Sequence, residues 1–163
     1  MLTVSYLDKT EKERLLPVLF DLLYENMRTV APGLPYEQEK ALWLSQVSPA
    51  MDKPERQILI CWQNGKPVGY LQYYIRQDLL MLEELQLVKS CRSTTALLKL
   101  IRFLLPGLPA DLTRLEAYAD KRNAYSQALM QKLGMERLPM PEEAPFVHYR
   151  GSLGEIRRRF DRT

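Results

Sequence analysis

The sequence predicts a single α/β domain with a mixed central sheet of six to seven strands flanked by four helices. The chain has 163 residues, which suits one domain with a substantial buried core. Hydrophobic residues make up 46% of it and charged residues 26%, as in ordinary globular proteins. The spacing of apolar residues changes along the chain between alternation, typical of strands, and three- or four-residue steps, typical of helices. The predicted order is strand, two helices, three strands, helix, strand, helix, and then one or two further strands.

The N-terminal segment predicts an edge strand followed by an amphipathic helix. Apolar and polar side chains alternate over residues 2–7, which indicates a strand. Asp8 and Thr10 can both cap a helix, and Thr10 together with Glu13 fits a capping box. Apolar residues then recur at helical spacing over residues 11–29, so we expect one face of this helix to be buried.

A proline-containing loop separates this helix from a second one. Residues 31–35 read APGLP, which predicts a rigid connection. The second helix is predicted over residues 36–47, with Trp43 facing inward. We expect Ser48 and Pro49 to end it.

The middle of the chain predicts an antiparallel meander. Three strands are expected, at residues 57–63, 66–76 and 79–89. Asn64-Gly65 between the first two is the strongest hairpin signal in the sequence. Gln77-Asp78 predicts a second tight turn. Strands joined by such short turns pair in antiparallel fashion.

The pattern then changes to a crossover unit. Ser93 or Thr94 can cap a helix that ends at Pro106-Gly107, and residues 114–120 alternate again as a strand. A strand, a crossover helix and a second strand of this length form a right-handed unit whose strands are parallel. The sheet is therefore expected to be mixed.

The remaining segment predicts one more helix and a last strand. Asn123 is a helix N-cap, and Gly134 is a natural C-terminal glycine. Residues 146–153 alternate as a strand. We expect the domain to span residues 1–153 and the basic segment 154–163 to be a mobile tail.

Charge and cysteine content argue against several classes of function. The net charge is +3, so the field of the whole protein is weak and no nucleic-acid partner is expected. Cys61 and Cys91 form no CxxC pattern and His148 is the sole histidine, so we expect no metal site. Apolar stretches fall short of the ~20 residues of a membrane span, and the N-terminus lacks a signal-peptide pattern. These features predict a cytoplasmic protein with no membrane partner, and they leave a homodimer open.

Three segments in a fixed order carry a family resemblance. Residues 64–70 read NGKPVGY, residues 85–98 read LQLVKSCRSTTALL, and residues 123–135 read NAYSQALMQKLGM. Together with the order of elements, these segments resemble the GCN5-related N-acetyltransferase (GNAT) family over nearly the whole chain. The middle segment departs from the family pattern, because no glycine is present in its loop and Lys89 replaces a proline. In the last segment Met130 replaces a tyrosine.

The resemblance implies a fold that binds acetyl-CoA as co-substrate. The loop entering the helix at residues 92–97 would hold the diphosphate on backbone N–H groups, which the helix dipole favours. The amides around Leu87 and Val88 would polarise the thioester carbonyl. The coenzyme-contacting residues implied by the resemblance are Leu87, Val88, Lys89, Arg92, Ser93, Thr94, Thr95, Ala96, Leu97, Asn123 and Ser126.

A general base would remove a proton from the amine acceptor. Glu83 and Glu84 lie on the strand that leads into the implied site, and strand alternation would direct them to opposite faces. We favour Glu83, because it shares a face with Leu85 and Leu87 and because the resemblance places it where related enzymes often keep a carboxylate. Glu84 is the alternative. The usual general acid is absent, since methionine at position 130 cannot donate a proton. Tyr125, on the same helix, is a poor substitute on spacing.

The sequence leaves alternatives open for the acceptor site and for the function. By fold analogy, the acceptor would lie near Tyr24, Glu25, Arg28, residues 32–36 and residues 146–149, with Glu25 or Glu37 binding a cationic amine. The first hypothesis is an N-acetyltransferase that acts on a primary amine of a small molecule or protein. The second is a catalytically degenerate relative that serves as a CoA-binding or protein-interaction module. A third, an acyl-transfer toxin or self-modifying system acting on aminoacyl groups, is selected by no residue.

Overall fold

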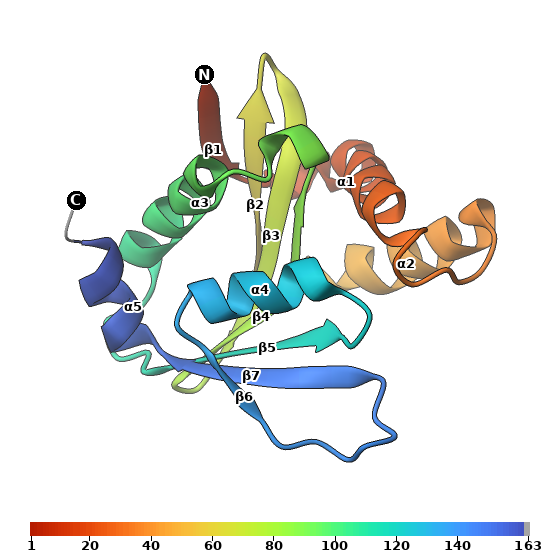
Figure 1. The fold of residues 1–163 in the computed structure, drawn as a ribbon. Helices are drawn as coiled ribbons and strands as arrows, with labels where there is room; N and C mark the ends of the chain where they lie inside the picture. The colour runs from red at the N-terminus through yellow and green to blue at the C-terminus, as the bar shows by residue number, and fades with distance from the viewer. Residues whose placement is uncertain (162–163) are drawn as a thin grey trace.

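The computed structural model describes residues 1–161, apart from the side chain of Thr94, and shows a seven-stranded sheet with five α-helices (Figure 1). The strands are β1 (Leu2–Tyr6), β2 (Arg56–Gln63), β3 (Lys66–Arg76), β4 (Leu79–Leu87), β5 (Arg114–Asp120), β6 (Glu136–Leu138) and β7 (Phe146–Ser152). The helices are α1 (Lys12–Met27), α2 (Tyr36–Ala50), α3 (Thr94–Gly107), α4 (Ala124–Lys132) and α5 (Leu153–Phe160). Two 3₁₀ turns, η1 (Lys9–Glu11) and η2 (Lys89–Cys91), precede α1 and α3.

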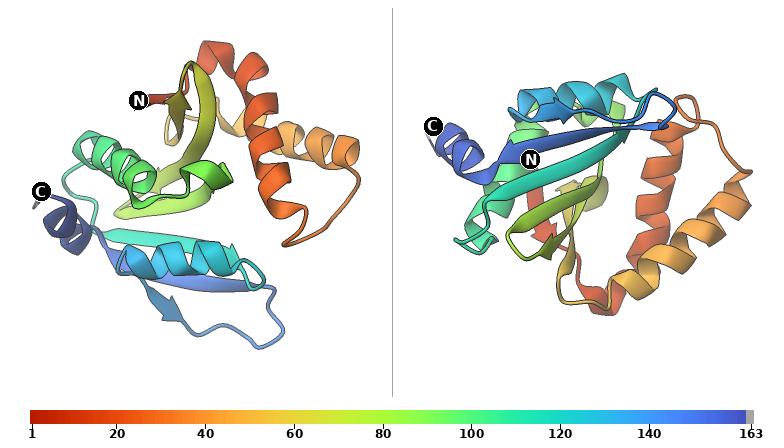
Figure 2. Two further views of the ribbon diagram at one scale, coloured as in Figure 1. Left: turned by 45° about the horizontal axis from the view of Figure 1, so that its top comes forward. Right: turned by 90° about the horizontal axis from the view of Figure 1, so that it is seen from below.

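The sheet is mixed and is covered by helices on both faces. Its strand order is β1-β2-β3-β4-β5-β7-β6, and β4 with β5 is the parallel pair among antiparallel neighbours. Helices α1 and α2 pack on one face, where they bury Leu16, Leu19 and Ile60. Helices α3, α4 and α5 contribute to a larger core on the other face. Figure 2 shows α1 and α2 across the sheet from α3. The predicted α/β class, meander and parallel crossover are confirmed.

Strands β4 and β5 pair over only part of their length. The parallel ladder joins residues 79–82 to residues 114–117. Beyond it, β4 continues to Leu87 beside β3, and β5 continues to Asp120 beside β7. Within the described residues the two strands therefore diverge, and α4 lies over the opening (Figures 1 and 2).

A β-bulge interrupts β4 at the point of divergence. Gln72 of β3 lies opposite Glu84 and Tyr73 lies opposite Leu82, so Glu83 is the extra residue. A bulge breaks the strict alternation of side chains. The prediction that Glu83 and Glu84 face opposite sides of the sheet, on which Glu83 was favoured, is therefore wrong.

Two positions in the antiparallel meander depend on glycine, one in a turn and one within β3. Asn64 and Gly65 have φ angles of 52° and 73°, which is the left-handed pair of a type I′ hairpin and confirms the predicted turn. At Gly69, an added Cβ would lie 2.4 Å from Leu87 Cδ2 and 2.7 Å from the carbonyl oxygen of Gln86. Only glycine lets β3 approach β4 so closely, and this contact fixes the end of β4.

Helix ends differ from the predictions in two places. Asp8 accepts the N–H of Thr10 at 2.9 Å and so caps η1, and no side-chain cap is present at α1 in the described residues. The predicted capping box of Thr10 with Glu13 is thus wrong, because an extra 3₁₀ turn moves the start of α1. Helix α2 continues through Ser48 and Pro49 to Ala50. Pro49 lacks the N–H that would bond the carbonyl four residues earlier, and the helix ends one residue after it.

The segment predicted to be a mobile tail forms α5 as far as Phe160, which raises the number of α-helices from four to five. Leu153 is 1% exposed and Ile156 is 4% exposed, and both join the core under α3. Ser152 accepts the N–H of Glu155 at 3.3 Å as the N-cap. The run of arginines made the apolar spacing of this helix hard to recognise in the sequence.

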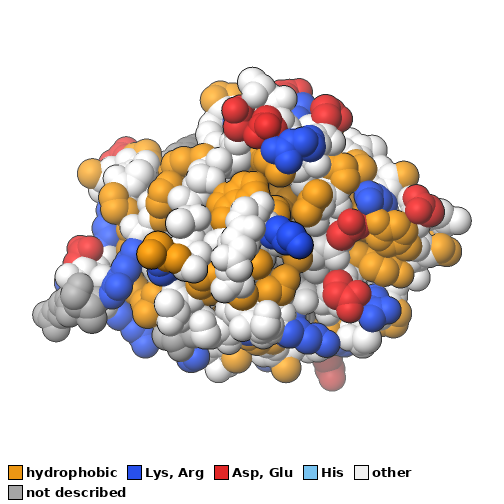
Figure 3. Space-filling view, turned by 90° about the horizontal axis from the view of Figure 1, so that it is seen from above, with side chains coloured by type: hydrophobic (Ala, Val, Ile, Leu, Met, Phe, Trp, Pro, Cys, Tyr) orange, Lys and Arg blue, Asp and Glu red, His pale blue; other side chains and the backbone are white. Residues whose placement is uncertain are grey.

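Figure 3 shows Lys and Arg gathered mainly on the α5 side, with both charge signs mixed over α1 and α2.

Candidate active site

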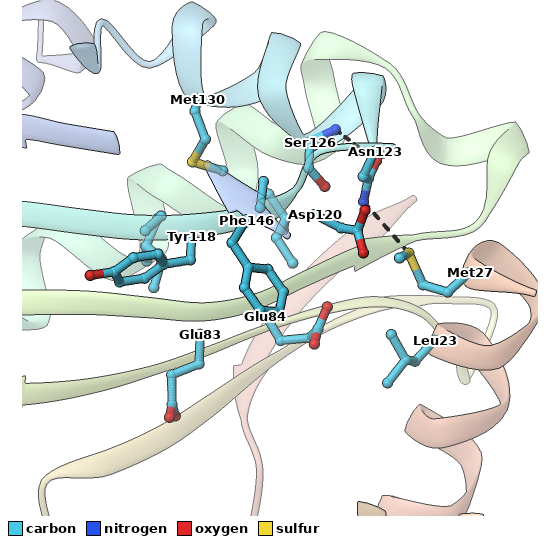
Figure 4. A pocket seen from close by; sticks show the side chains of 14 residues that line it. Leu23, Met27, Glu83, Glu84, Tyr118, Asp120, Asn123, Ser126, Met130 and Phe146 are labelled. Atoms are coloured by element: carbon cyan, nitrogen blue, oxygen red, sulfur yellow. Dashed lines mark hydrogen bonds between the residues drawn. The ribbon is translucent and has the colours of Figure 1, made fainter. Parts of the chain in front are cut away.

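A cleft opens where β4 and β5 diverge. Its volume is about 290 Å³, and side chains from β4, β5, α1, α4 and the start of β7 line it (Figure 4). Its walls include Glu83, Glu84, Tyr118, Met130 and Phe146. The partial pairing of the strands thus creates a space that reaches the interior of the sheet.

The cleft continues toward the start of α3. An adjoining cavity of about 180 Å³ shares Met27, Leu85, Asn123 and Ser126 with it. Arg92 and Arg122 line this second cavity. The combined space therefore leads from a carboxylate-containing end to an end with two arginines.

The edge of β4 offers backbone groups to this space. The N–H of Val88 donates to the carbonyl of Val68 at 2.9 Å. In an antiparallel pair successive residues point their backbone groups to opposite sides, so the N–H groups of Leu85 and Leu87 face away from β3. The expectation for Leu87 agrees with this geometry. Val88 was expected to supply a free amide as well, and this is wrong because its N–H is bonded within the sheet.

The carbonyl of Leu87 is already occupied. Asn26 of α1 donates to it at 3.0 Å through Nδ2, and Arg92 donates through Nε at 3.3 Å. A ligand at this edge could therefore accept hydrogen bonds from the Leu85 and Leu87 amides. It would have to share the Leu87 carbonyl with Asn26 and Arg92.

The predicted diphosphate loop divides into exposed and buried parts. Ser93 and Thr95 are exposed at the start of α3, as is Lys89 in η2. Ala96 and Leu97 are buried in the core, so only their backbone could contact a ligand. Ser93 holds the N-cap position of α3. Within the described residues its side chain makes no capping hydrogen bond, and the first turn of the helix contains no acidic residue. The side chain of Thr94 lies outside the described residues.

Arg92 is positioned by a tyrosine that sequence reasoning did not connect with it. Its guanidinium lies 4.3 Å from the ring centroid of Tyr125, which is a cation–π contact. Burial raises the pKa of Tyr125, and the charge of Arg92 partly opposes this. The contact links η2 with α4 across the cleft.

Asn123 performs the predicted capping role. Its Oδ1 accepts the N–H of Ser126 at 3.1 Å, and its Nδ2 donates to Sδ of Met27 at 3.5 Å (Figure 4). The first contact orders α4, and the second joins α4 to α1. Asn123 and Ser126 both line the cleft.

Glu83 is held in an ion pair. Arg56 donates to its two carboxylate oxygens at 2.7 Å and 2.6 Å, and Gln72 donates to it at 3.0 Å. A carboxylate whose two oxygens are held by three donors has fewer lone pairs free to meet an incoming ammonium group. Glu83 therefore has the geometry of a structural residue.

Glu84 has the properties of a general base. Burial raises its pKa to about 7, the hydrogen bond from Gln86 lowers it, and the charge of Glu83 raises it further. Gln86 donates through Nε2 at 2.6 Å, and Asn26 donates to the Oε1 of Gln86 at 2.9 Å. In Figure 4 the Glu84 carboxylate extends toward the α1 side, where Leu23 and Met27 lie. A pKa close to neutral suits proton transfer at physiological pH.

No replacement for the missing tyrosine acid stands out within the described residues. Met130 is buried and lines the cleft. The hydroxyl of Tyr70 is buried without a hydrogen-bond partner among the described residues, and burial raises the pKa of Tyr70 well above its usual value. Tyr118 lines the cleft, but its ring stacks on His148 at 4.3 Å.

Three further side chains, those of His148, Cys91 and Glu25, are held in structural contacts. His148 Nε2 lies 2.8 Å from a carboxylate oxygen of Glu116. Cys91 is buried beside Gln63. Glu25 forms an exposed ion pair with Arg28 at 3.0 Å.

Neither a metal centre nor a membrane span is found in the part of the chain that the structure describes. Its residues contain no group of three or more His, Cys, Asp or Glu side chains that could hold a metal ion. Among the helices described, none has the length and apolar character needed to cross a membrane.

Solved structures share this fold. An acetyltransferase from Thermus thermophilus is 17% identical with a TM-score of 0.72, and the match covers 93% of this chain and 97% of that one. One from Streptococcus agalactiae is 15% identical with a TM-score of 0.73, covering 93% and 98%. A PaiA N-acetyltransferase from Thermoplasma acidophilum in complex with coenzyme A is 12% identical with a TM-score of 0.69, covering 93% and 99%. By sequence, no family model and no curated protein matches. The chain thus has the acetyltransferase fold that its three segments implied.

Proposed function

We propose that this protein, whose fold is that of the GNAT acetyltransferases, transfers an acetyl group from acetyl-CoA to a primary amine. The observation that carries the proposal is the divergence of β4 from β5, which opens a cleft along the free amides of β4 that extends to Arg92, just before α3. In the structural neighbour from Thermoplasma acidophilum the same fold is found in complex with coenzyme A. The coenzyme would place its diphosphate at residues 92–97, with Arg92 supplying positive charge.

The proposed reaction uses Glu84 as the base. Glu84 takes one proton from the ammonium form of the acceptor, and the free amine then attacks the thioester carbonyl. The Leu87 amide, at the open edge of β4, would stabilise the oxyanion of the tetrahedral intermediate. The carbon–sulfur bond breaks, the nitrogen releases its second proton to water, and the coenzyme leaves as a thiolate that takes a proton from water. Glu84 then returns its own proton to solvent. Because a thiolate is a tolerable leaving group, Met130 in place of a tyrosine does not prevent this route.

A second candidate is a protein that binds CoA, or a protein partner, without catalysis. Met130 and the loop without glycine favour it. A cytoplasmic location, a single domain and a homodimer stay predictions.

Calorimetry with CoA and acetyl-CoA, followed by a thiol-release assay with an amine panel, tests the proposal. We expect binding of both ligands and release of CoA thiol only when an amine is present. Binding without thiol release would favour the non-catalytic candidate. Absence of both heat and thermal stabilisation would contradict coenzyme binding altogether.

The pH dependence of kcat/KM tests Glu84. Activity should fall as the pH drops below about 7, because a protonated Glu84 cannot accept a proton. Gln86→Leu should move this acidic limb to higher pH, because the hydrogen bond from Gln86 lowers the pKa of Glu84. Glu83→Gln should move it to lower pH, because the charge of Glu83 raises that pKa. One amine is used throughout, so its own titration is common to all variants. Shifts in the same direction, or none, would contradict the assignment.

A further inference from the structure

The acceptor side of the cleft carries an apolar surface that the transfer reaction itself does not require. Tyr118 is 49% exposed and Phe146 is 48% exposed, and both line the cleft opposite Leu23 and Met27 of α1. Large side chains exposed at this level inside a cleft are typical of a binding site. In Figure 4 the Phe146 ring lies between the Tyr118 side and the Glu84 side of the cleft.

This apolar surface continues into a groove between α1 and α2. The groove has a volume of about 250 Å³ and shares Leu23 and Met27 with the cleft. Its walls include Trp43, and Leu34 and Leu42, each 50% exposed, stand at its rim. An apolar group that enters the cleft beside Glu84 could therefore extend over Leu23 and Met27 into the groove.

The carboxylates that line the cleft can pair with one positively charged nitrogen of a ligand. Three carboxylates line it, and two are neutralised within the protein. Arg56 donates twice to Glu83, and Arg122 donates twice to Asp120 at 3.0 Å, which lowers the pKa of Asp120. Within residues 1–161, Glu84 alone of the three has no cationic partner among the ion pairs. A ligand with several cations would leave most of them unpaired in an apolar space, which is costly.

We infer that the acceptor is a small primary monoamine carried on an aromatic or branched apolar group, an inference that rests on the proposed function. The amine would meet Glu84, and the apolar group would lie between Phe146 and the α1 surface formed by Leu23 and Met27. Polyamines, aminoglycosides and lysine-rich peptides would be poor acceptors. The volume of the cleft, part of which the acetyl group would fill, suits a small molecule rather than a folded protein surface.

Kinetics with matched amines test the inference. We expect kcat/KM for 2-phenylethylamine to exceed that for ethylamine and spermidine by about 10-fold or more, since 10-fold corresponds to about 1.4 kcal/mol of binding. Phe146→Ser should lower the value for 2-phenylethylamine by about 10-fold more than it lowers the value for ethylamine. The matched control is Phe103→Ser, because Phe103 is 39% exposed on α3 and forms a tilted ring pair with Tyr6 outside the cleft.

The outcomes separate the inference from the proposed function. CoA binding with thiol release, but with ethylamine or spermidine preferred, would overturn the monoamine inference and leave the transferase proposal intact. Equal losses in the Phe146 and Phe103 variants would overturn the role of the apolar surface. Absence of CoA binding would overturn both. Calorimetric titration of 2-phenylethylamine into the CoA complex gives a readout independent of turnover and should show weakened binding only for Phe146→Ser.

Discussion

Glu84→Gln is expected to lower kcat/KM by about 10²- to 10⁴-fold, the usual contribution of a positioned general base. Glutamine occupies nearly the same volume and can still accept the hydrogen bond from Gln86, so the cleft should keep its shape. The measurement is kcat/KM for acetyl transfer to one amine, with CoA affinity measured alongside. Unchanged CoA affinity with lost turnover would support the assignment, whereas full activity would contradict it.

The same substitution should stabilise the folded protein above neutral pH. The pKa of Glu84 is about 7 in the folded state against an ordinary 4.5, so the folded state holds the extra proton between these values. The free energy of unfolding therefore decreases as the pH rises from 4.5 to 7. Above pH 7 the charged carboxylate lowers it by up to about 3 kcal/mol, since one pKa unit corresponds to about 1.4 kcal/mol. Glutamine has no charge to bury and removes this cost.

Urea unfolding at pH 5 and pH 8 measures the effect. The variant should gain little at pH 5 and most at pH 8. Glu83→Gln is the matched control and should lose stability, because it leaves the partly buried Arg56 without its carboxylate. A gain for Glu84→Gln that is independent of pH would refute the assigned titration.

Ser126→Trp is expected to weaken CoA binding by about 100-fold or more, equivalent to about 2.7 kcal/mol. Ser126 lines both the cleft and its extension, so an indole at this position would fill the space between β4 and α4. The capping contact should survive, because Asn123 accepts the backbone N–H of residue 126. The measurement is calorimetric titration with CoA.

Gln131→Trp provides the control for this change. It places the same side chain on α4 at an exposed position outside the cleft. It should bind CoA like the original protein, with a circular dichroism spectrum that matches that of the Ser126 variant. Equal CoA affinity in the two variants would show that the ligand does not occupy this cleft.

Local patterns predicted most of the fold. The hairpin at Asn64-Gly65 follows from residues that favour positive φ. The limits of β3 follow from the turns on either side of it, and those of β5 follow from alternation. The helix α5 was missed because its arginines suggested a solvated tail, while only Leu153 and Ile156 reveal a buried face. A tail and a helix of this composition differ mainly in whether a core is available to receive those two side chains.

The site was predicted less well than the fold. The glutamate pair was found from its place on the strand, but the choice between Glu83 and Glu84 depended on a bulge that no local pattern announces. Arg56, the partner of Glu83, lies 27 residues away in the sequence. The stacking of Arg92 on Tyr125 likewise joins two elements that meet only in the folded chain.

The short ladder between β4 and β5 has a mechanical consequence. Four residue pairs join the first four strands of the sheet to the last three, so the protein consists of two sub-sheets connected by a narrow region of hydrogen bonding. Any extended molecule that bonds to the unpaired edge of β4 would supply rungs that the polypeptide lacks. A bound ligand would thereby strengthen the connection between the two sub-sheets. The free and ligand-bound forms should therefore differ in rigidity across this junction.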